Sequence, residues 1–239
     1  MNLLSQLSSL SLYVGQAHPC PYLPDNSATT MLVDPYRKMS LELYDLLLQQ
    51  GFRRSGEYVY KPGCETCSAC ISVRIPTSRF RPNRSQRRVL KRQQNGSVAR
   101  LPAKFKESHY AMYMRYLQQR HEESDMCHGD RSSYMEFLAS SWCHTEFIEL
   151  WDEHDYCFAV SVADITVNAI SAVYTFFDPQ YAKYSPGQLA ILRLIELARE
   201  QGKTWVYLGY WIEQCRKMAY KVNYKPTQKL FTNEWIEEN

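Results

Sequence analysis

The stretch SPGQLAILRLIELAREQGKTWVYLG, from Ser185 to Gly209, carries the clearest structural signal in this chain. Its first part predicts a helix, because Ser185 can cap it, Pro186 suits the first turn, and a Leu/Ile stripe runs to Gly202. The residues TWVYLG that follow predict a strand. Since a helix separates this strand from the one before it, we expect a crossover that places the two strands parallel in one sheet.

Three segments before this helix predict an antiparallel meander: TEFIELWD (145–152), YCFAVSVAD (156–164) and NAISAVYTFFD (168–178). Two amphipathic helices are expected before the meander, in KESHYAMYMRYLQQRH (106–121) and RSSYMEFLASS (131–141). This order is the outline of the acyltransferase fold of the N-acetyltransferase superfamily. In that fold, the N-terminus of a helix beside a splayed pair of strands receives an activated acyl donor.

The N-terminal part of the chain predicts further helices and strands. DPYRKMSLELYDLLLQQG (34–51) predicts a helix that Asp34 can cap. The strands expected in EYVYKP (57–62) and ISVRIP (71–76) flank a loop rich in cysteine.

A second N-terminal helix is expected in PNRSQRRVLKRQQNG, capped by Asn83 or Ser85. The residues after it, 100–106, contain a proline and are interpreted as a linker. We therefore expect an α/β (α+β) protein with a smaller N-terminal α/β domain, residues 1–105, and an N-acetyltransferase-like (GNAT-type) domain, residues 106–239.

Charge is segregated along the 239 residues, although the net charge is only +3. Residues 71–106 contain eleven Arg and Lys and no acid, whereas residues 121–155 contain ten acids and one base. Residues 203–229 are basic again, with six Lys and Arg against one Glu. This segregation favours a polyanionic partner such as nucleic acid. The alternative is two solvated faces that pair with each other across a domain interface.

The start of the chain, MNLLSQLSSLSLYVGQ, has no basic flank and no cleavage pattern of a signal peptide. The least polar run, residues 165–177, is too short to span a bilayer and contains Asn168. We therefore expect a soluble cytoplasmic protein. Its eight cysteines should stay reduced in that compartment.

Three of these cysteines lie in KPGCETCSAC (61–70), at a C-x-x-C-x-x-C spacing. Cys64, Cys67 and Cys70 could supply three thiolates, and Cys20 in HPCPYLP could be the fourth ligand. Four sulfurs would suit zinc or an iron–sulfur cluster. The alternative is a tight loop of reduced cysteines packed beneath a substrate site.

Aromatic and cationic residues alternate in YLGYWIEQCRKMAYKVNYKP (207–226). Such a mixture suits a single-stranded nucleic-acid end, on which rings stack and ammonium groups hold phosphates. The alternative is an aromatic strand and helix packed into the core. The helix start offers the backbone amides of Ser185, Gly187 and Gln188 to an anion, but it departs from the pyrophosphate loop of coenzyme A enzymes. That departure counts against an acetyl-CoA donor.

Taken together, these stretches resemble the aminoacyl-tRNA–protein transferases of the N-degron pathway. The resemblance is carried by HPCPYLP, GFRRSGEYVYKPGC (51–64), SVRIP, SRFRPNRSQRRVLKR (78–92), the Ser185–Gly187 helix start and residues 207–226. The segments CPYLP and SRFRPNRSQRRVLKR are most similar to the bacterial branch of that family.

The resemblance implies transfer of leucine from its tRNA to proteins with N-terminal Asp or Glu, which marks them for degradation. An arginyl-tRNA–protein transferase of the same family is the first alternative, and a non-catalytic, metal-stabilised RNA-binding module is the second. The ester of an aminoacyl-tRNA is already activated, so the chemistry requires no cofactor and no protein nucleophile, although Cys215 stays a candidate. Relatives carry cysteine pairs where this chain has Cys20 with Leu23 and Cys67 with Ser68, so its metal-ligand set is incomplete.

The candidate site residues fall into three groups. Catalytic candidates are Tyr210, Lys217 and Tyr220. Candidates for contact with tRNA are Arg84, Arg87, Arg88, Lys91, Arg92, Ser185, Gly187, Lys221 and Tyr224. Arg74 is the candidate for reading the acidic side chain of the acceptor, because a guanidinium offers two parallel donors to a carboxylate. The alternative for Arg74 is an internal ion pair with an acid such as Glu57, in which case Arg37 or Arg53 becomes the next candidate.

Overall fold

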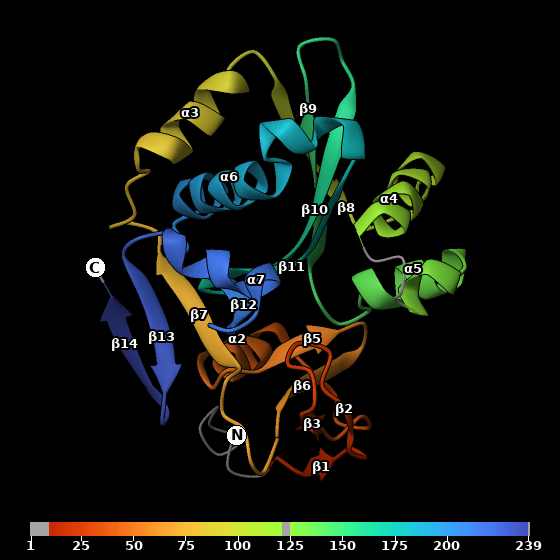
Figure 1. Cartoon of the computed structure of the whole chain (residues 1–239), viewed down its shortest axis with the longest axis vertical. Coiled ribbons are helices and arrows are strands. Elements are labelled where there is room, and N and C mark those ends of the chain that lie inside the picture. Colours follow the sequence, from red (N-terminus) through yellow and green to blue (C-terminus); the bar gives the residue numbers. More distant parts are fainter. Residues whose placement is uncertain (1–9, 121–124, 239) are drawn as a thin grey trace.

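The computed structural model of this chain describes residues 10–120 and 125–238, and its main feature is an eight-stranded sheet (Figure 1). In their order across the sheet, the strands are β14 (Glu234–Glu238), β13 (Thr227–Phe231), β7 (Ile71–Pro76), β12 (Trp205–Trp211), β11 (Ala169–Phe177), β10 (Cys157–Ile165), β9 (Thr145–Trp151) and β8 (Ser97–Pro102). Within these strands, β11 and β12 pair in parallel, and the other neighbouring pairs are antiparallel. The predicted meander and crossover are both confirmed.

A second, smaller sheet forms from the N-terminal part of the chain. Its strands, in spatial order, are β1 (Leu12–Val14), β4 (Thr30–Val33), β6 (Tyr58–Pro62) and β5 (Arg53–Ser55), with a two-stranded pair of β2 (His18–Pro19) and β3 (Ser27–Ala28) beside it. These strands lie at one end of the large sheet (Figure 1). The predicted fold class, mixed α/β with a smaller N-terminal sheet unit, is confirmed.

Helices cover both faces of the large sheet (Figure 1). On β12, Val206 and Leu208 face the core beneath α6, whereas Tyr207 faces the core formed with α2. None of the described helices has the length and apolarity that crossing a membrane requires. The helices are α2 (Leu41–Gln49), α3 (Arg84–Arg92), α4 (Glu107–Arg120), α5 (Arg131–Leu138), α6 (Pro186–Glu200) and α7 (Arg216–Ala219), with 3-10 turns η1 (Asp125–His128), η2 (Pro179–Tyr184) and η3 (Tyr220–Asn223).

The parallel strands β11 and β12 separate after a short contact. Their pairing begins at Ala169 opposite Trp205 and ends at Ser171 opposite Tyr207, although both strands continue further. A bulge between Tyr207 and Gly209 disturbs the pairing of β12 with β7 at the same level, and Gly209 has a positive φ of 81°. Glycine tolerates that conformation without strain. The splayed strand pair expected of an acyltransferase fold is therefore present.

Two predicted helix caps differ from the structure in instructive ways. Asp34 does not cap α2, because its carboxylate accepts from the N–H of Tyr36 in a local turn, and Ser40 caps the helix by accepting from Leu43 N–H. Ser185 holds the cap position of α6, but its side chain makes no capping hydrogen bond and its φ is 58°. For α3, the cap is Asn83, which forms a full capping box with Gln86.

The predicted linker at residues 100–106 is wrong at its start, because β8 runs to Pro102 and pairs with β9. This edge strand is mostly exposed, so its sequence lacks the apolar run that usually marks a strand. Since β7 and β8 both belong to the large sheet, that sheet extends across residue 105. The division into residues 1–105 and 106–239 stays a prediction about folding units. His121, at the end of the predicted helix 106–121, lies outside the described residues.

Candidate active site

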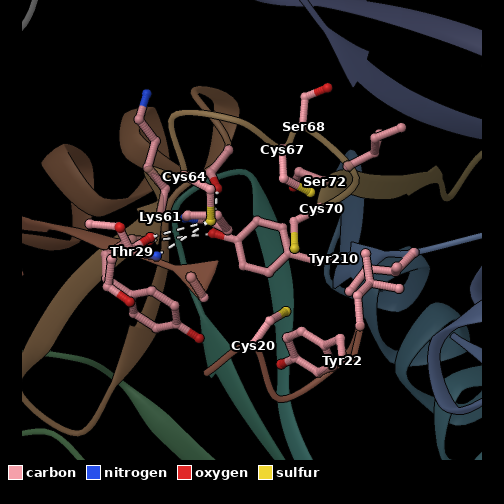
Figure 2. Close-up of a pocket in the computed structure, with 18 of the residues that line it drawn as sticks. Cys20, Tyr22, Thr29, Lys61, Cys64, Cys67, Ser68, Cys70, Ser72 and Tyr210 are labelled. Carbon is pink, nitrogen blue, oxygen red and sulfur yellow. Dashed lines mark hydrogen bonds between the residues drawn. The ribbon is translucent and has the colours of Figure 1, made fainter. Parts of the chain in front are cut away.

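A pocket of about 640 Å³ lies between the small sheet unit and the end of β12. Its walls come from the β2–β3 segment, the cysteine loop after β6, the last residues of β12 and the turn between β13 and β14. Cys20, Cys64, Cys67 and Cys70 all line it, and Figure 2 shows them around the ring of Tyr210. Among the residues that the structure describes, no Asp or Glu lines it. The pocket therefore suits an uncharged or anionic group better than a cationic one.

The four cysteines of this pocket are free cysteines. Cys64 Sγ accepts from Thr29 N–H at 3.4 Å and faces Thr29 O at 3.7 Å, the geometry of a protonated thiol. The pKa of Cys70 is raised to about 11. Burial is the main cause, and the neighbouring Cys20, Cys64 and Cys67 add to it. A metal would require these groups as thiolates.

The four pocket cysteines do not form a compact cluster of ligand atoms in the described structure. Among the described residues, the group of three ligand atoms within 4.8 Å of one another is His109, Glu149 and Cys157, which lies elsewhere. In that cluster Glu149 accepts from both His109 and Lys106, so its carboxylate is already engaged. Metal binding by the four pocket cysteines stays a prediction, and the reaction proposed below requires no metal.

Tyr210, a predicted catalytic residue, lines the pocket but has its hydroxyl engaged. The O–H donates to Gly51 O at 2.9 Å, and burial raises its pKa well above the ordinary value. Its ring lies 6.5 Å from that of Tyr60. Tyr210 therefore links β12 to Gly51, in the turn after α2. Its hydroxyl proton is already donated to a carbonyl oxygen, which favours a structural role.

The other two catalytic candidates lie outside the pocket lining. Lys217, on α7, and Tyr220, which begins η3, are both exposed. Their position leaves them available to a large ligand that covers α7, and the structure brings neither of them to the thiols or to Tyr210.

Lys221 is buried, although the sequence placed it among the surface contacts to tRNA. Its Nζ donates to Tyr210 O at 2.7 Å. Burial, followed by the nearby charge of Arg53, lowers its pKa to about 7. A cation this deep is not part of the outer surface that a tRNA backbone would cover.

Arg53, on β5, is one of the two arginines that stood next to Arg74 as candidates for reading the acceptor. It is buried, its Nη2 donates to Ala172 O on β11, and its Nη1 has no hydrogen-bond partner within the described part of the chain. A Cβ placed on Gly209 would lie 3.5 Å from both Arg53 Cζ and Lys221 Nζ, so the two cations are neighbours over the backbone of β12. No local pattern in GFRRSGEYVYKPGC reveals which of its arginines is buried at the splay.

Arg74 does not line the pocket and does not pair with Glu57. Its guanidinium lies between the rings of Trp205 and Trp235, at 3.6 and 4.1 Å from their centroids. Its Nε donates to Gln228 Oε1 at 2.8 Å. Burial lowers its pKa, and the aromatic faces compensate the loss of water around the charge. These contacts favour a structural role for Arg74 over the predicted acceptor-binding role.

The basic stripe on α3 is exposed, as a surface for a polyanion must be. The buried residues of this helix, Gln86 and Val89, lie on its other side. Val89 packs in the core with residues of α6, and the Gln86 side chain donates to Asn223 O. No ion pair is found for any residue of the stripe within the described structure. The stripe consists of Arg84, Arg87, Arg88, Lys91 and Arg92.

The remaining tRNA candidates occupy different environments. Tyr224 is buried in the core against Phe80, so its ring is not available to stack on a base. At the α6 start, Ser185 N–H donates to Ala182 O and Gln188 N–H donates to Ser185 O, so two of the expected anion-binding amides are engaged. Gly187 faces open space, since nothing lies within 4 Å of a Cβ placed there.

Comparisons with known proteins agree on one family. The model described as "Arginine-tRNA-protein transferase, C terminus" matches residues 108–231, and its N-terminal counterpart matches residues 18–88. The aspartate/glutamate leucyltransferase of Hahella chejuensis is 46% identical over 233 residues, covering 98% of this chain and 99% of the relative. That of Saccharophagus degradans is 42% identical with the same coverage.

Among solved structures, L-PGS from Bacillus licheniformis aligns over 88% of this chain and 71% of its own, at 11% identity and a TM-score of 0.49. FemX aligns over 86% of this chain and 80% of its own, at 9% identity and a TM-score of 0.45. The family assignment rests on the sequence matches alone. The chain belongs to the family of aminoacyl-tRNA–protein transferases that includes the aspartate/glutamate leucyltransferases.

Proposed function

We propose that this protein transfers leucine from leucyl-tRNA to the α-amine of proteins that begin with Asp or Glu. Relatives of that name match nearly its full length at 42 to 46% identity. The main structural support for the proposal is the separation of β11 and β12 beside a pocket whose described lining residues include no carboxylate. A splayed strand pair exposes backbone groups to an acyl donor, and a lining without acids tolerates an acidic acceptor.

The reaction joins the acceptor nitrogen to the carbonyl carbon of the aminoacyl ester, and the ribose oxygen of tRNA leaves with a proton. The enzyme must hold the amine and the ester together and keep the amine unprotonated. The charge of Arg53 already helps to lower the pKa of the Lys221 ammonium. An α-ammonium at the splay would meet the same positive field and would lose its proton more readily.

The lining of the pocket favours leucine over arginine as the transferred residue. A carboxylate is the partner that best compensates a buried arginyl side chain, and the described residues of this lining include none. It does offer apolar contacts, such as Leu23, Ile71 and Leu230. A leucyl side chain therefore fits its chemistry better.

The proposal is tested by transfer from tRNA charged with labelled leucine or arginine to peptides beginning with Asp, Glu, Lys or Ala. We expect label from leucyl-tRNA on the Asp and Glu peptides alone. Transfer from arginyl-tRNA instead would support an arginyltransferase. RNA binding without transfer to any peptide would support a binding module.

The α3 stripe is expected to contact phosphates of the tRNA. Replacing Arg87, Arg88 and Lys91 together with Ala should weaken binding and make the plot of log K against log salt less steep, by about one unit per lost contact. Filter binding from 50 to 300 mM salt measures the slope. Arg131→Ala is the control, because this exposed arginine already pairs with Glu107 and should leave the slope unchanged. An unchanged slope in the triple variant would assign the stripe to another partner.

A further inference from the structure

Five cationic side chains are buried in the described structure, and three of them are compensated. Arg54 pairs with Asp164, Arg74 lies between two tryptophan rings, and Lys229 pairs with Glu238 over the ring of Trp211. Arg53 and Lys221 are the remaining two. Among the described residues, neither of them forms an ion pair with a carboxylate.

Arg53 and Lys221 are adjacent as well as uncompensated. Both groups lie 3.5 Å from the position of a Cβ on Gly209, and their hydrogen bonds go to backbone carbonyls, those of Ala172 and Tyr210. Arg53 is 7% exposed, and its Nη1 has no partner within the described residues. Two like charges in a low dielectric repel each other, and a spare guanidinium N–H is left without an acceptor. An anion between them would relieve both problems.

The pair lies where the reaction is expected to take place. Ala172 is the first residue of β11 beyond its pairing with β12, so Arg53 holds a carbonyl that the splay sets free. Lys221 holds the carbonyl of Tyr210, whose ring lines the pocket.

We propose that Arg53 and Lys221 form the receptor for the side-chain carboxylate of the acceptor's N-terminal Asp or Glu, an inference that rests on the proposed function. In both amino acids the carboxylate is separated from the α-amine by only a few bonds. A receptor for it must therefore adjoin the point where the amine attacks, as this pair does. A guanidinium and an ammonium together can satisfy both oxygens of one carboxylate.

A backbone phosphate is the less suitable anion. A phosphodiester carries a nucleoside on each side and needs an open groove, whereas these two cations are almost fully buried. The exposed stripe on α3 offers a surface for phosphates instead. Lys61 is the cation in the pocket lining itself, but its Nζ lies over the Phe52 ring, 4.7 Å from the centroid.

The test compares peptides that differ only in charge at the first residue. We expect the wild type to prefer Asp over Asn, and Glu over Gln, by about 100-fold or more in kcat/KM, because an amide leaves the buried charges unpaired. Arg53→Gln and Lys221→Met should each reduce this ratio at least tenfold. Lys221→Arg should keep more of it than Lys221→Met. Lys225→Met is the matched control, because this nearby lysine is exposed and faces Glu238.

A variant without turnover is tested by fluorescence anisotropy, with peptides labelled at the C-terminus that begin with Asp or Asn. Loss of the binding preference supports the receptor. A preference that persists in both variants overturns it, and so does a raised KM for leucyl-tRNA with an unchanged Asp-to-Asn ratio. If the wild type transfers leucine to no peptide, the proposed function fails instead. Circular dichroism and thermal melts confirm that each variant is folded.

Discussion

Arg54→Met should destabilise the protein by about 3–5 kcal/mol, because it leaves a buried carboxylate without its counter-ion. The side chains of Arg54 and Asp164 are both 0% exposed. Arg54 Nε donates to Asp164 Oδ2 at 2.7 Å, and its Nη2 also donates to Leu138 O and Thr145 Oγ1. Burial tends to lower the pKa of Arg54, but the charge of Asp164 outweighs it and holds the pKa above its ordinary value. Urea denaturation measures the loss.

Arg131→Met is the control for this prediction. Arg131 also forms a two-pronged pair with an acid, Glu107, but both side chains are 62% exposed, so its loss should change the free energy of unfolding far less than Arg54→Met does. The double variant Arg54→Met, Asp164→Leu should be more stable than the sum of the single effects implies, since it removes both charges. Strict additivity would show that the pair is not coupled.

This ion pair also bears on how the chain is divided. Arg54 lies on β5 of the small sheet, and Asp164 lies on β10 of the large sheet. A second buried contact, from Asp45 on α2 to Thr166 and Asn168, joins the same two parts. Because Asp45 still joins the two parts in Arg54→Met, we expect both parts of this variant to unfold together in one cooperative transition.

Local signals were sufficient for most of the helices and strands. Helix α3 was predictable because one short segment contains its cap, Asn83, together with the pattern of its buried and exposed residues. The crossover after β11 followed from Pro186 and Gly202 at the two ends of a strongly apolar helix. β8 was missed because an exposed edge strand obtains its order from pairing with β9, which its own residues do not reveal.

The site was predictable in its parts but not in its chemistry. The metal hypothesis brought Cys20 together with the cysteine loop, and these residues line one pocket, although metal binding stays a prediction. The meeting of Arg53 with Lys221 depends on β5, β12 and η3 coming together, and segments so distant leave no common motif. Tyr224 shows the same limit, because an aromatic residue that packs in the core looks in the sequence like one that stacks on a base.

Lys221→Met should raise the free energy of unfolding, and the gain should be larger at pH 6 than at pH 9.5. The folded-state pKa of Lys221 is lowered from 10.5 to about 7, chiefly by burial. Between these values the unfolded chain binds more protons than the folded chain, so the stability of the wild type rises with pH relative to the variant. Below pH 7 both states hold the proton, and the full penalty of burying the charge applies. A shift of this size corresponds to a difference on the order of 4 kcal/mol across the window.

Urea titrations of the wild type and of Lys221→Met at the two pH values measure this difference, and groups that both proteins share cancel in it. Lys225→Met is the control again, and its gap from the wild type should vary little with pH because this lysine is exposed. A gap for Lys221→Met that is equal at both pH values would mean that the charge of Lys221 is already compensated in the free protein. That result would also remove the reason for an acidic ligand at Arg53 and Lys221. The predicted result instead describes a cation that destabilises the free enzyme and is stabilised by the carboxylate of its substrate, a trade of stability for function.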